Sequence, residues 1–196
     1  MADAGRVIAG SARGVRLAAP GPGTRPLTDR VKQALFGILE PELDGAAVLD
    51  LFAGSGAGGI EALSRGAASA VFVEKDGGAA RVIGENLRRT RLEAVGRVSR
   101  RDALAWLAEA ATADDRWDVV LVDPPYADLD ALVGVLRAVG TVVRPGGVVV
   151  AKHFWRDAPP PAIGLLASER ERRFGETALT FYRREAGGVE QEADEA

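Results

Sequence analysis

The chain has 196 residues, of which 47% are hydrophobic and 27% are charged, and its net charge is −3 at pH 7. These values are typical of a globular protein of about one domain, large enough to bury a sizeable core. With no cysteine and one histidine, the chain cannot form disulfides, thiolate metal sites or histidine-rich metal sites, and a Ser-His-Asp triad is disfavoured.

The N-terminal segment over residues 6–17 alternates weakly between apolar and polar residues and is interrupted by glycines. This pattern predicts a β-hairpin with its turn near Gly10 and with Arg6, Arg13 and Arg16 on the exposed face. Six basic and three acidic residues lie in the first forty positions, which fits a polyanionic partner. A solvated arm explains the charges equally well.

A helix is predicted from Arg30 to Leu39. Its apolar residues have helical spacing, Thr28 and Asp29 offer an N-cap, and Pro41 ends the pattern.

From residue 45 onward, short apolar runs alternate with segments of helical spacing. Strands are expected over 48–52, 70–74, 95–102, 117–122 and 147–152. Helices are expected over 58–65, 77–90, 103–111 and 129–139. This alternation predicts a mostly parallel, Rossmann-like α/β sheet covered on both faces. Two further runs, 168–174 and 178–183, predict an antiparallel pair that completes a seven-stranded sheet.

Both ends of the chain are expected to lie outside the main domain. Five acids and no base follow Arg184, so we expect residues 185–196 to form a disordered acidic tail. The expected organisation is a basic extension over 1–23, a main domain over 24–184 and this tail. No apolar run approaches the ~20 residues of a membrane span. The N-terminus lacks the apolar segment of a secretory signal, so we expect a cytoplasmic protein.

A glycine-rich turn, Asp50-Leu51-Phe52-Ala53-Gly54-Ser55-Gly56, joins the first parallel strand to its helix. Glycines let a ligand approach the backbone, and the helix N-terminus offers free N–H groups. Together with Gly59, the turn also matches the dinucleotide spacing G-x-G-x-x-G. A nicotinamide-dependent oxidoreductase is therefore one alternative, and such turns also occur without any ligand.

Three acids follow successive strands and narrow the choice of ligand. Asp50 suits a cationic amino group and would repel a pyrophosphate, Glu74 can accept both ribose hydroxyls, and Asp102 can accept an adenine amino hydrogen. A ligand with an ammonium, a ribose and an adenine but no phosphate is S-adenosylmethionine. Each acid alone is explained as well by a solvated strand end or a helix N-cap.

The fourth parallel strand ends in Asp123-Pro124-Pro125-Tyr126. Proline has no N–H and a fixed φ, so the pair stops strand pairing and holds the chain extended. The Asp123 carboxylate and the Pro124 carbonyl can accept hydrogens from an exocyclic amine, which aims the nitrogen lone pair at a methyl donor. Tyr126 can stack on the ring that carries the amine.

These motifs resemble the Asp-Pro-Pro-Tyr amino-methyltransferases, and within them the bacterial 16S ribosomal RNA guanine-N2 methyltransferases (small-subunit rRNA methyltransferase D type). The resemblance covers nearly the whole chain from Arg6 to Arg183. Its specific segments, besides the glycine turn and Asp123–Tyr126, are 6–10, 25–32, 35–36 and 61–67.

The resemblance implies transfer of a methyl group from S-adenosylmethionine to a guanine N2 in 16S ribosomal RNA, within an assembling small ribosomal particle. It also implies that the N-terminal hairpin contacts RNA and that residues 25–29 cap the methionine end of the cofactor. The expected cofactor site comprises Arg25, Thr28, Asp50, Phe52, Ala53, Gly54, Ser55, Gly56, Glu74, Lys75, Asp102, Ala103 and Asp123. The expected catalytic residues are Asp123, Pro124, Pro125 and Tyr126, and the expected RNA contacts are Arg6, Arg13, Arg16 and Arg30. No metal is expected.

Other readings stay open at this point. They include an adenine-N6 methyltransferase acting on DNA or RNA and an inactive RNA-binding assembly factor with the same fold. We expect a monomer. Deleting residues 1–17 is expected to abolish RNA modification and to leave cofactor binding intact. His153 is expected at the surface, and Phe154-Trp155-Arg156 is expected to form an exposed stacking lip.

Overall fold

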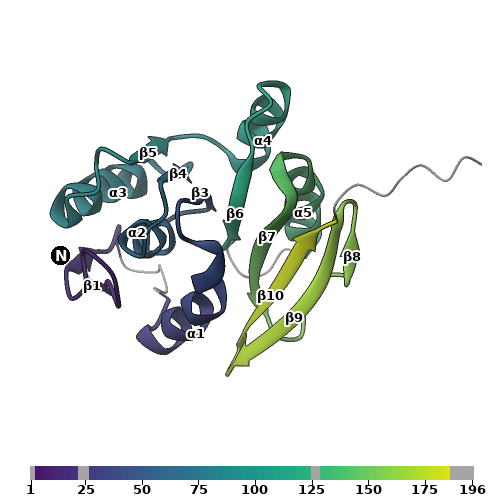
Figure 1. The fold of residues 1–196 in the computed structure, drawn as a ribbon, viewed down its shortest axis with the longest axis horizontal. Coiled ribbons are helices and arrows are strands. Elements are labelled where there is room, and N and C mark those ends of the chain that lie inside the picture. Colours follow the sequence, from purple (N-terminus) through teal and green to yellow (C-terminus); the bar gives the residue numbers. More distant parts are fainter. Residues whose placement is uncertain (1–2, 22–26, 125–128, 186–196) are drawn as a thin grey trace, which may run out of the picture.

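The computed structural model describes residues 3–21, 27–124 and 129–185. One sheet dominates it, in the spatial order β5 (Gly96–Ser99), β4 (Ser69–Val73), β3 (Ala47–Leu51), β6 (Trp117–Val122), β7 (Val143–Phe154), β10 (Thr177–Arg184), β9 (Leu166–Phe174) and β8 (Ala162–Ile163). The first five of these strands are parallel, as predicted. Figure 1 shows the sheet with helices packed on both sides.

Helices connect the parallel strands in the predicted order. They are α2 (Ala57–Ser64), α3 (Gly77–Thr90), α4 (Ala103–Thr112) and α5 (Leu129–Val142). The strands are rich in valine and leucine because both of their faces are buried. Within the described part of the chain, no helix combines the length and the apolar character needed to cross a membrane.

The C-terminal part of the sheet is antiparallel, with β10 between β7 and β9. The predicted hairpin of two long strands is confirmed. The structure adds an eighth strand, β8, at the edge of β9. A strand of two residues is too short to show an alternating pattern, so no sequence signal marks it.

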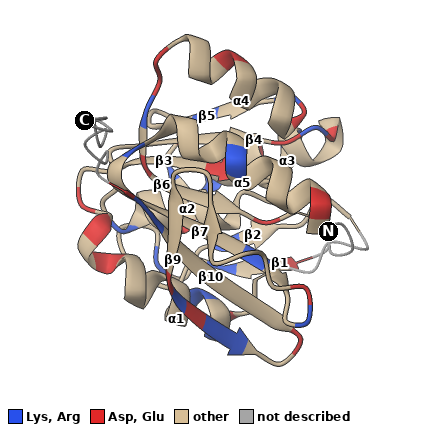
Figure 2. Cartoon of the chain, turned by 90° about the vertical axis from the view of Figure 1, so that its right-hand side faces the viewer, with Lys and Arg blue, Asp and Glu red and all other residues tan. Residues whose placement is uncertain are grey.

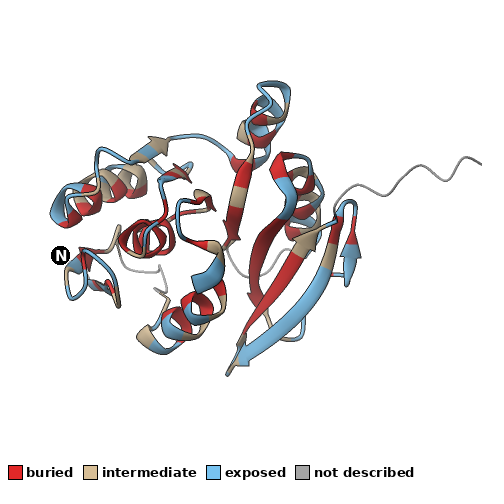
Figure 3. Ribbon diagram, in the orientation of Figure 1, coloured by how far each residue is buried: buried red, intermediate tan, exposed pale blue. Residues whose placement is uncertain are grey.

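The sheet separates two hydrophobic cores, and burial is concentrated between the layers (Figure 3). One face packs against α2, α3 and the first helix, α1 (Asp29–Leu39), with Val150 and Phe181 among its residues. The other face packs against α4 and α5, with Ala151 and Tyr182 among its residues. Neighbouring residues of a strand therefore belong to different cores, as the alternation of side chains requires.

The N-terminal hairpin is part of the domain rather than an appendage. Its strands, β1 (Asp3–Arg6) and β2 (Arg16–Ala18), pair antiparallel. The buried Glu61 carboxylate on α2 accepts hydrogen bonds from the backbone N–H groups of Ile8 (2.8 Å) and Ala9 (3.1 Å). Asn86 on α3 exchanges two hydrogen bonds with the backbone of Ala18. Deleting the hairpin would leave the buried side chains of Glu61 and Asn86 without these partners, so we expect the deletion to destabilise the domain as well as to abolish RNA modification.

The predicted turn around Gly10 lies against α2. A Cβ at this residue would stand 1.6 Å from the Ser64 carbonyl oxygen, and its φ is +83°. Only glycine fits such a close approach in this conformation. The Ser11 N–H, next in the chain, donates to the same carbonyl at 2.8 Å.

The arginines of the hairpin are exposed, as predicted, but two of them already have partners. Arg6 pairs with Asp29 at 3.1 Å, and Arg16 pairs with Asp3. Their positive charge is therefore partly neutralised within the domain.

The first helix begins and ends as the sequence predicts. The Thr28 hydroxyl accepts a hydrogen bond from the Val31 N–H, which is the expected N-cap. A short 3-10 helix, η1 (Glu40–Glu42), contains Pro41 and follows the helix directly.

The expectation of a surface histidine is wrong. His153 is 4% exposed, and its ring nitrogens contact the Thr180 hydroxyl (2.8 Å) and the Phe154 carbonyl (2.9 Å). The reason is that β7 continues to Phe154, so His153 is still covered by its neighbour β10. Trp155, expected to be exposed, is half-buried, with the guanidinium of Arg173 stacked 3.6 Å from its ring centre.

Candidate active site

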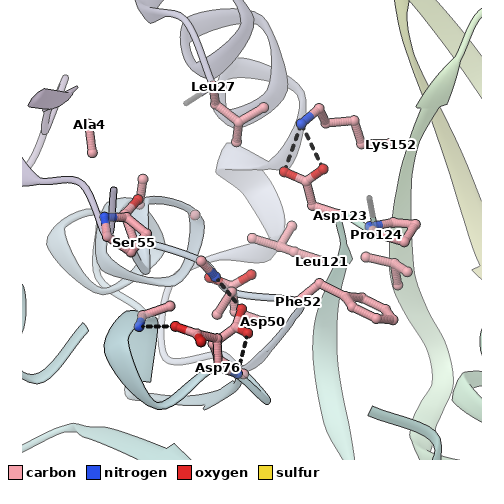
Figure 4. A pocket seen from close by; sticks show the side chains of 18 of the residues that line it. Ala4, Leu27, Asp50, Phe52, Ser55, Asp76, Leu121, Asp123, Pro124 and Lys152 are labelled. Atoms are coloured by element: carbon pink, nitrogen blue, oxygen red, sulfur yellow. Dashed lines mark hydrogen bonds and ion pairs between the residues drawn. The ribbon is translucent and has the colours of Figure 1, made fainter. Parts of the chain in front are cut away.

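A cavity of about 660 Å³ lies at the carboxyl ends of the parallel strands. Its size suits a cofactor with part of a second substrate. The walls come from the glycine turn, the ends of β4 and β6, the strands β7 and β10, the middle of α1 with the residue Leu27 before it, and the segment after β2. Ala4 and Pro20 contribute to this cavity, so the N-terminal hairpin forms part of the same site. Figure 4 shows the arrangement of these side chains.

The glycine turn is held in shape by its fit against the sheet. Gly56, with φ +76°, is the N-cap of α2. A Cβ on Gly59 would stand 2.4 Å from the Phe72 ring, so this residue lets α2 lie directly on β4. The Phe52–Ser55 segment then forms part of the cavity wall.

Glu74 connects two turns of the cavity wall. Its carboxylate accepts hydrogen bonds from the Gly54 N–H and the Asp76 N–H, each at 2.9 Å. Each carboxylate oxygen has a second lone pair, so Glu74 retains the capacity to accept ribose hydroxyls. The side chain is half-buried and lines the cavity.

Asp50 is a buried acid, 4% exposed, at the floor of the cavity. Burial raises the pKa of its carboxyl to about 8, the nearby Asp123 and Glu74 carboxylates add to the rise, and the Gly59 N–H opposes it. That N–H donates to the Asp50 carboxylate at 2.8 Å. The ligand-free site therefore favours a proton on Asp50 that a bound cation would displace.

Asp123, the acid of the Asp-Pro-Pro-Tyr motif, faces Lys152 of β7 across the cavity wall (Figure 4). The Lys152 ammonium lies 2.7 Å from Oδ1 and 2.8 Å from Oδ2 of Asp123. Burial raises the pKa of the Asp123 carboxyl above its ordinary value, and Lys152 opposes that rise. The lysine thus favours the ionised form, which accepts hydrogen bonds and donates none.

The cavity brings together most of the residues expected at the site. The predicted residues that line it are Asp50, Phe52, Ala53, Gly54, Ser55, Glu74, Lys75, Asp123 and Pro124. Thr28, Gly56, Asp102 and Ala103 are not among the lining residues. Arg25, Pro125 and Tyr126 fall outside the described part of the chain.

Asp102 is the N-cap residue of α4. Its carboxylate caps α4 by accepting hydrogen bonds from the N–H groups of Leu104 (3.0 Å) and Ala105 (3.2 Å). This is the N-cap alternative that its sequence position also allowed, and its contact with an adenine stays a prediction.

Lys152 is the functional residue that sequence reasoning missed. The parallel register pairs Val122 of β6 with Ala151 of β7, so the next residues, Asp123 and Lys152, meet at the same level. A lysine at the end of the buried run 147–151 was a usable signal, but only the neighbouring strand identifies its partner.

The residues of the cavity fit S-adenosylmethionine. In the described ranges, neither Asp50 nor Glu74 forms an ion pair with a basic side chain, and Lys152 is already paired with Asp123. Even with a proton on Asp50, the lining acids Glu74, Asp76 and Asp123 outnumber the lining lysines Lys75 and Lys152, which favours a cationic ligand and disfavours a phosphate. S-adenosylmethionine carries an ammonium and a sulfonium and has no phosphate.

We expect cofactor affinity to rise with pH up to about 8 and then to level off. Asp50 has a pKa of about 8 without ligand, and a bound cation lowers that pKa, so binding at lower pH releases a proton. Calorimetry in buffers with different heats of ionisation measures this release. Asp50→Asn should bind about 10–100-fold more weakly, because it loses one charged hydrogen bond, and without this pH dependence.

The raised pKa of Asp50 also predicts how the stability of the ligand-free protein changes with pH. Since the folded-state pKa of Asp50 is above its ordinary value, ionising this residue opposes folding. Stability should therefore fall as the pH rises from about 4 to 8. Thermal melts of Asp50→Asn should lack this part of the decline; a wild-type pH dependence in the variant would contradict the assignment.

The amino-acid sequence of the chain is similar to a known protein family and to curated proteins. Residues 5–183 match the protein family described as conserved hypothetical protein 95. The chain is 38% identical over 193 residues to ribosomal RNA small subunit methyltransferase D of Escherichia coli (strain K12), covering 96% of this chain and 94% of that protein.

Solved structures agree with this similarity. A hypothetical protein from Thermus thermophilus superposes with a TM-score of 0.78 at 41% identity, covering 90% of this chain and 97% of that one. An RNA methyltransferase from Salinibacter ruber, solved with S-adenosyl-L-homocysteine, superposes with a TM-score of 0.64 over 85% and 97% of the two chains. At 16% identity, this second likeness concerns the fold alone.

Proposed function

The chain belongs to the ribosomal RNA small subunit methyltransferase D family, and we propose that it methylates the exocyclic N2 of a guanine in 16S ribosomal RNA. It is an S-adenosylmethionine-dependent methyltransferase of ribosomal RNA. The choice of guanine N2, the 16S target and a small-subunit particle as the substrate form the proposal.

The observation that carries the proposal is the Asp123–Lys152 pair at the wall of the acidic cavity. An exocyclic amine on a base is a poor nucleophile because its lone pair is delocalised into the ring. The ionised Asp123 would accept one amine hydrogen, and the carbonyl of Pro124, which also lines the cavity, would accept the other. These contacts favour a pyramidal nitrogen whose lone pair points into the cavity.

Each residue at the site then has a separate task. S-adenosylmethionine supplies a methyl group on a positively charged sulfur, which departs as a neutral thioether. Asp50 would hold the ammonium end of this ligand, and Glu74 would hold the ribose. Asp123 would orient the attacking amine; the new N–C bond forms as the S–C bond breaks, and the extra proton on nitrogen then passes to solvent. Most of the rate gain comes from positioning.

Guanine suits these acceptors because its exocyclic N2 has two hydrogens to donate. Adenine N6 has the same two donors, so it is the main alternative within this chemistry. A nicotinamide-dependent oxidoreductase is disfavoured, because the lining acids Glu74 and Asp76 repel a pyrophosphate and the buried Asp50 would be ionised only beside a cation.

The test is to map the methylated base. Small subunits and naked 16S ribosomal RNA from a bacterial strain lacking this activity are incubated with the protein and isotope-labelled S-adenosylmethionine. We expect one labelled 2-methylguanine, identified by mass spectrometry of nuclease fragments. Label on adenine N6, or no label in either substrate, would refute the proposal.

A further inference from the structure

Two neighbouring arginines of β9 are exposed and have no acidic partner in the described part of the chain. Arg170 and Arg172 are both exposed. Within the described residues neither is in an ion pair, and their side chains form one hydrogen bond, from Arg172 to the Glu171 carbonyl at 3.1 Å. Figure 2 shows positive charge at the end of β9, next to α1.

Strand register connects these arginines with the active site. Lys152 of β7 pairs with Leu179 of β10, which pairs with Arg172. Lys152 and Leu179 both line the cavity, and residues paired directly across strands share one face of the sheet. Arg172 therefore continues the row that begins at the Asp123–Lys152 pair, about 10 Å further along the sheet from Lys152.

A second row repeats this arrangement. Val150, which lines the cavity, pairs with Phe181, and Phe181 pairs with Arg170. The two arginines thus lie on the cavity face of the sheet, two residues apart, with a separation of about 7 Å along the strand. That spacing allows contact with two different phosphates.

The acids of β9 do not cancel this charge. Glu171 lies opposite Thr180, whose hydroxyl donates to its carboxylate, so this acid is on the other face. Glu169 lies at an irregularity of the register and accepts hydrogen bonds from Arg183 at 3.1 and 3.2 Å. If the charges of β9 served only to prevent edge-to-edge aggregation, its acids and arginines could lie on either face of the sheet. Their separation by face is not explained by that role.

Other basic side chains nearby are already engaged. Arg173 is stacked on Trp155, and Arg183 contacts both Glu42 and Glu169. In the N-terminal hairpin, Arg6 and Arg16 pair with Asp29 and Asp3. Arg170 and Arg172 are therefore better placed to bind a new anion than the two paired arginines of the hairpin.

We propose that Arg170 and Arg172 form a second RNA contact, which holds two phosphates of the substrate strand beside the target base. This inference rests on the proposed function and extends it, because it specifies where the RNA leaves the cavity. The strand would leave the cavity past Lys152 and Leu179 and continue towards the exposed end of β9, on the far side of the site from the N-terminal hairpin.

The test compares Arg170→Ala/Arg172→Ala with the wild-type protein. Affinity for small subunits and for naked 16S ribosomal RNA is measured by filter binding at several salt concentrations. Loss of two phosphate contacts should lower the slope of log affinity against log salt by about 1.4 and raise KM for RNA about tenfold. Cofactor affinity and kcat at saturating RNA should stay unchanged.

Two further variants make the result specific. Arg170→Lys/Arg172→Lys keeps the charges and should restore most of the salt slope. Arg88→Ala/Arg137→Ala removes two exposed arginines on α3 and α5 and should leave affinity unchanged. Unaltered melting temperatures show that each variant is folded.

The outcomes separate this inference from the proposed function. Wild-type protein that methylates no RNA would refute the proposed function. If wild type methylates, but the double alanine variant behaves like the Arg88/Arg137 control, the β9 contact is refuted. It is also refuted if affinity falls for subunits but not for naked RNA, since the contact would then be with a ribosomal protein.

Discussion

Replacing Asp123 by alanine should reduce methyl transfer by about a thousandfold. The variant removes the acceptor that orients the amine, and loss of one such positioned group typically lowers kcat by about two to three orders of magnitude. Cofactor affinity should change less than about tenfold, because Asp50 and Glu74 are intact. Single-turnover transfer to RNA and calorimetry with the cofactor measure the two effects separately.

The same variant should also be less stable, because Lys152 loses its partner. Removing one member of a buried pair costs about 3–5 kcal/mol. Here the cost should be about 1–3 kcal/mol, since the Asp123 side chain is 32% exposed while Lys152 is 10% exposed. Asp123→Ala/Lys152→Met should recover this stability while transfer stays lost.

That double variant distinguishes positioning of the amine from support of the fold. If the double variant recovered transfer together with stability, Asp123 would matter only as the partner of Lys152. The single variant Lys152→Met should keep measurable transfer but move the acidic limb of the pH profile upward. Without the ammonium, the pKa of Asp123 rises further.

Glu61→Ala should be the most destabilising of the substitutions considered, by about 3–5 kcal/mol. The Glu61 side chain is fully buried, accepts two backbone N–H groups of the hairpin and pairs with Arg65 at 2.8 Å. It also opposes the fall in the pKa of the buried Lys32, which burial lowers. Removing it leaves the two backbone N–H donors and the Arg65 guanidinium without their acceptor, and it takes away a negative charge that stabilises the Lys32 ammonium.

The variant should also bind cofactor more weakly, because the hairpin and the segment after it form part of the cavity wall. Urea unfolding and calorimetry measure both effects. Glu109→Ala is the matched control, since Glu109 is a helical acid paired with Arg101 at the surface, where such pairs contribute less than about 1 kcal/mol. Equal unfolding midpoints for the two variants would refute the role of Glu61 in holding the hairpin.

The local sequence pattern was sufficient to predict the strands and connecting helices of the parallel half of the sheet. Valine-rich runs separated by segments of helical spacing predicted β3 to β7 and their helices, because a strand that is buried on both faces has a continuous run of apolar residues. Chain order then placed Asp50, Glu74 and Asp123 at one edge of the sheet. That edge is where the cavity lies.

The contacts that the sequence could not predict join residues that are far apart in the chain. Lys152 meets Asp123 only because β7 pairs with β6 in one register, and Glu61 holds Ile8 and Ala9 from 53 and 52 residues away. His153 was misplaced because its burial depends on β10.

The sequence by itself determined the order of the elements, the fold class and the chemistry of the acidic edge, since each follows from local pattern and residue type. Tertiary structure alone decided which charges are paired. Of the four arginines that the sequence predicted to contact RNA, Arg6 and Arg16 have acidic partners in the folded chain. Arg170 and Arg172 alternate with acids along the strand, and the register with β10 sets these two arginines on the cavity face, away from Glu171. The physical reason is that electrostatic interactions depend on distance in space, which only the packed sheet defines.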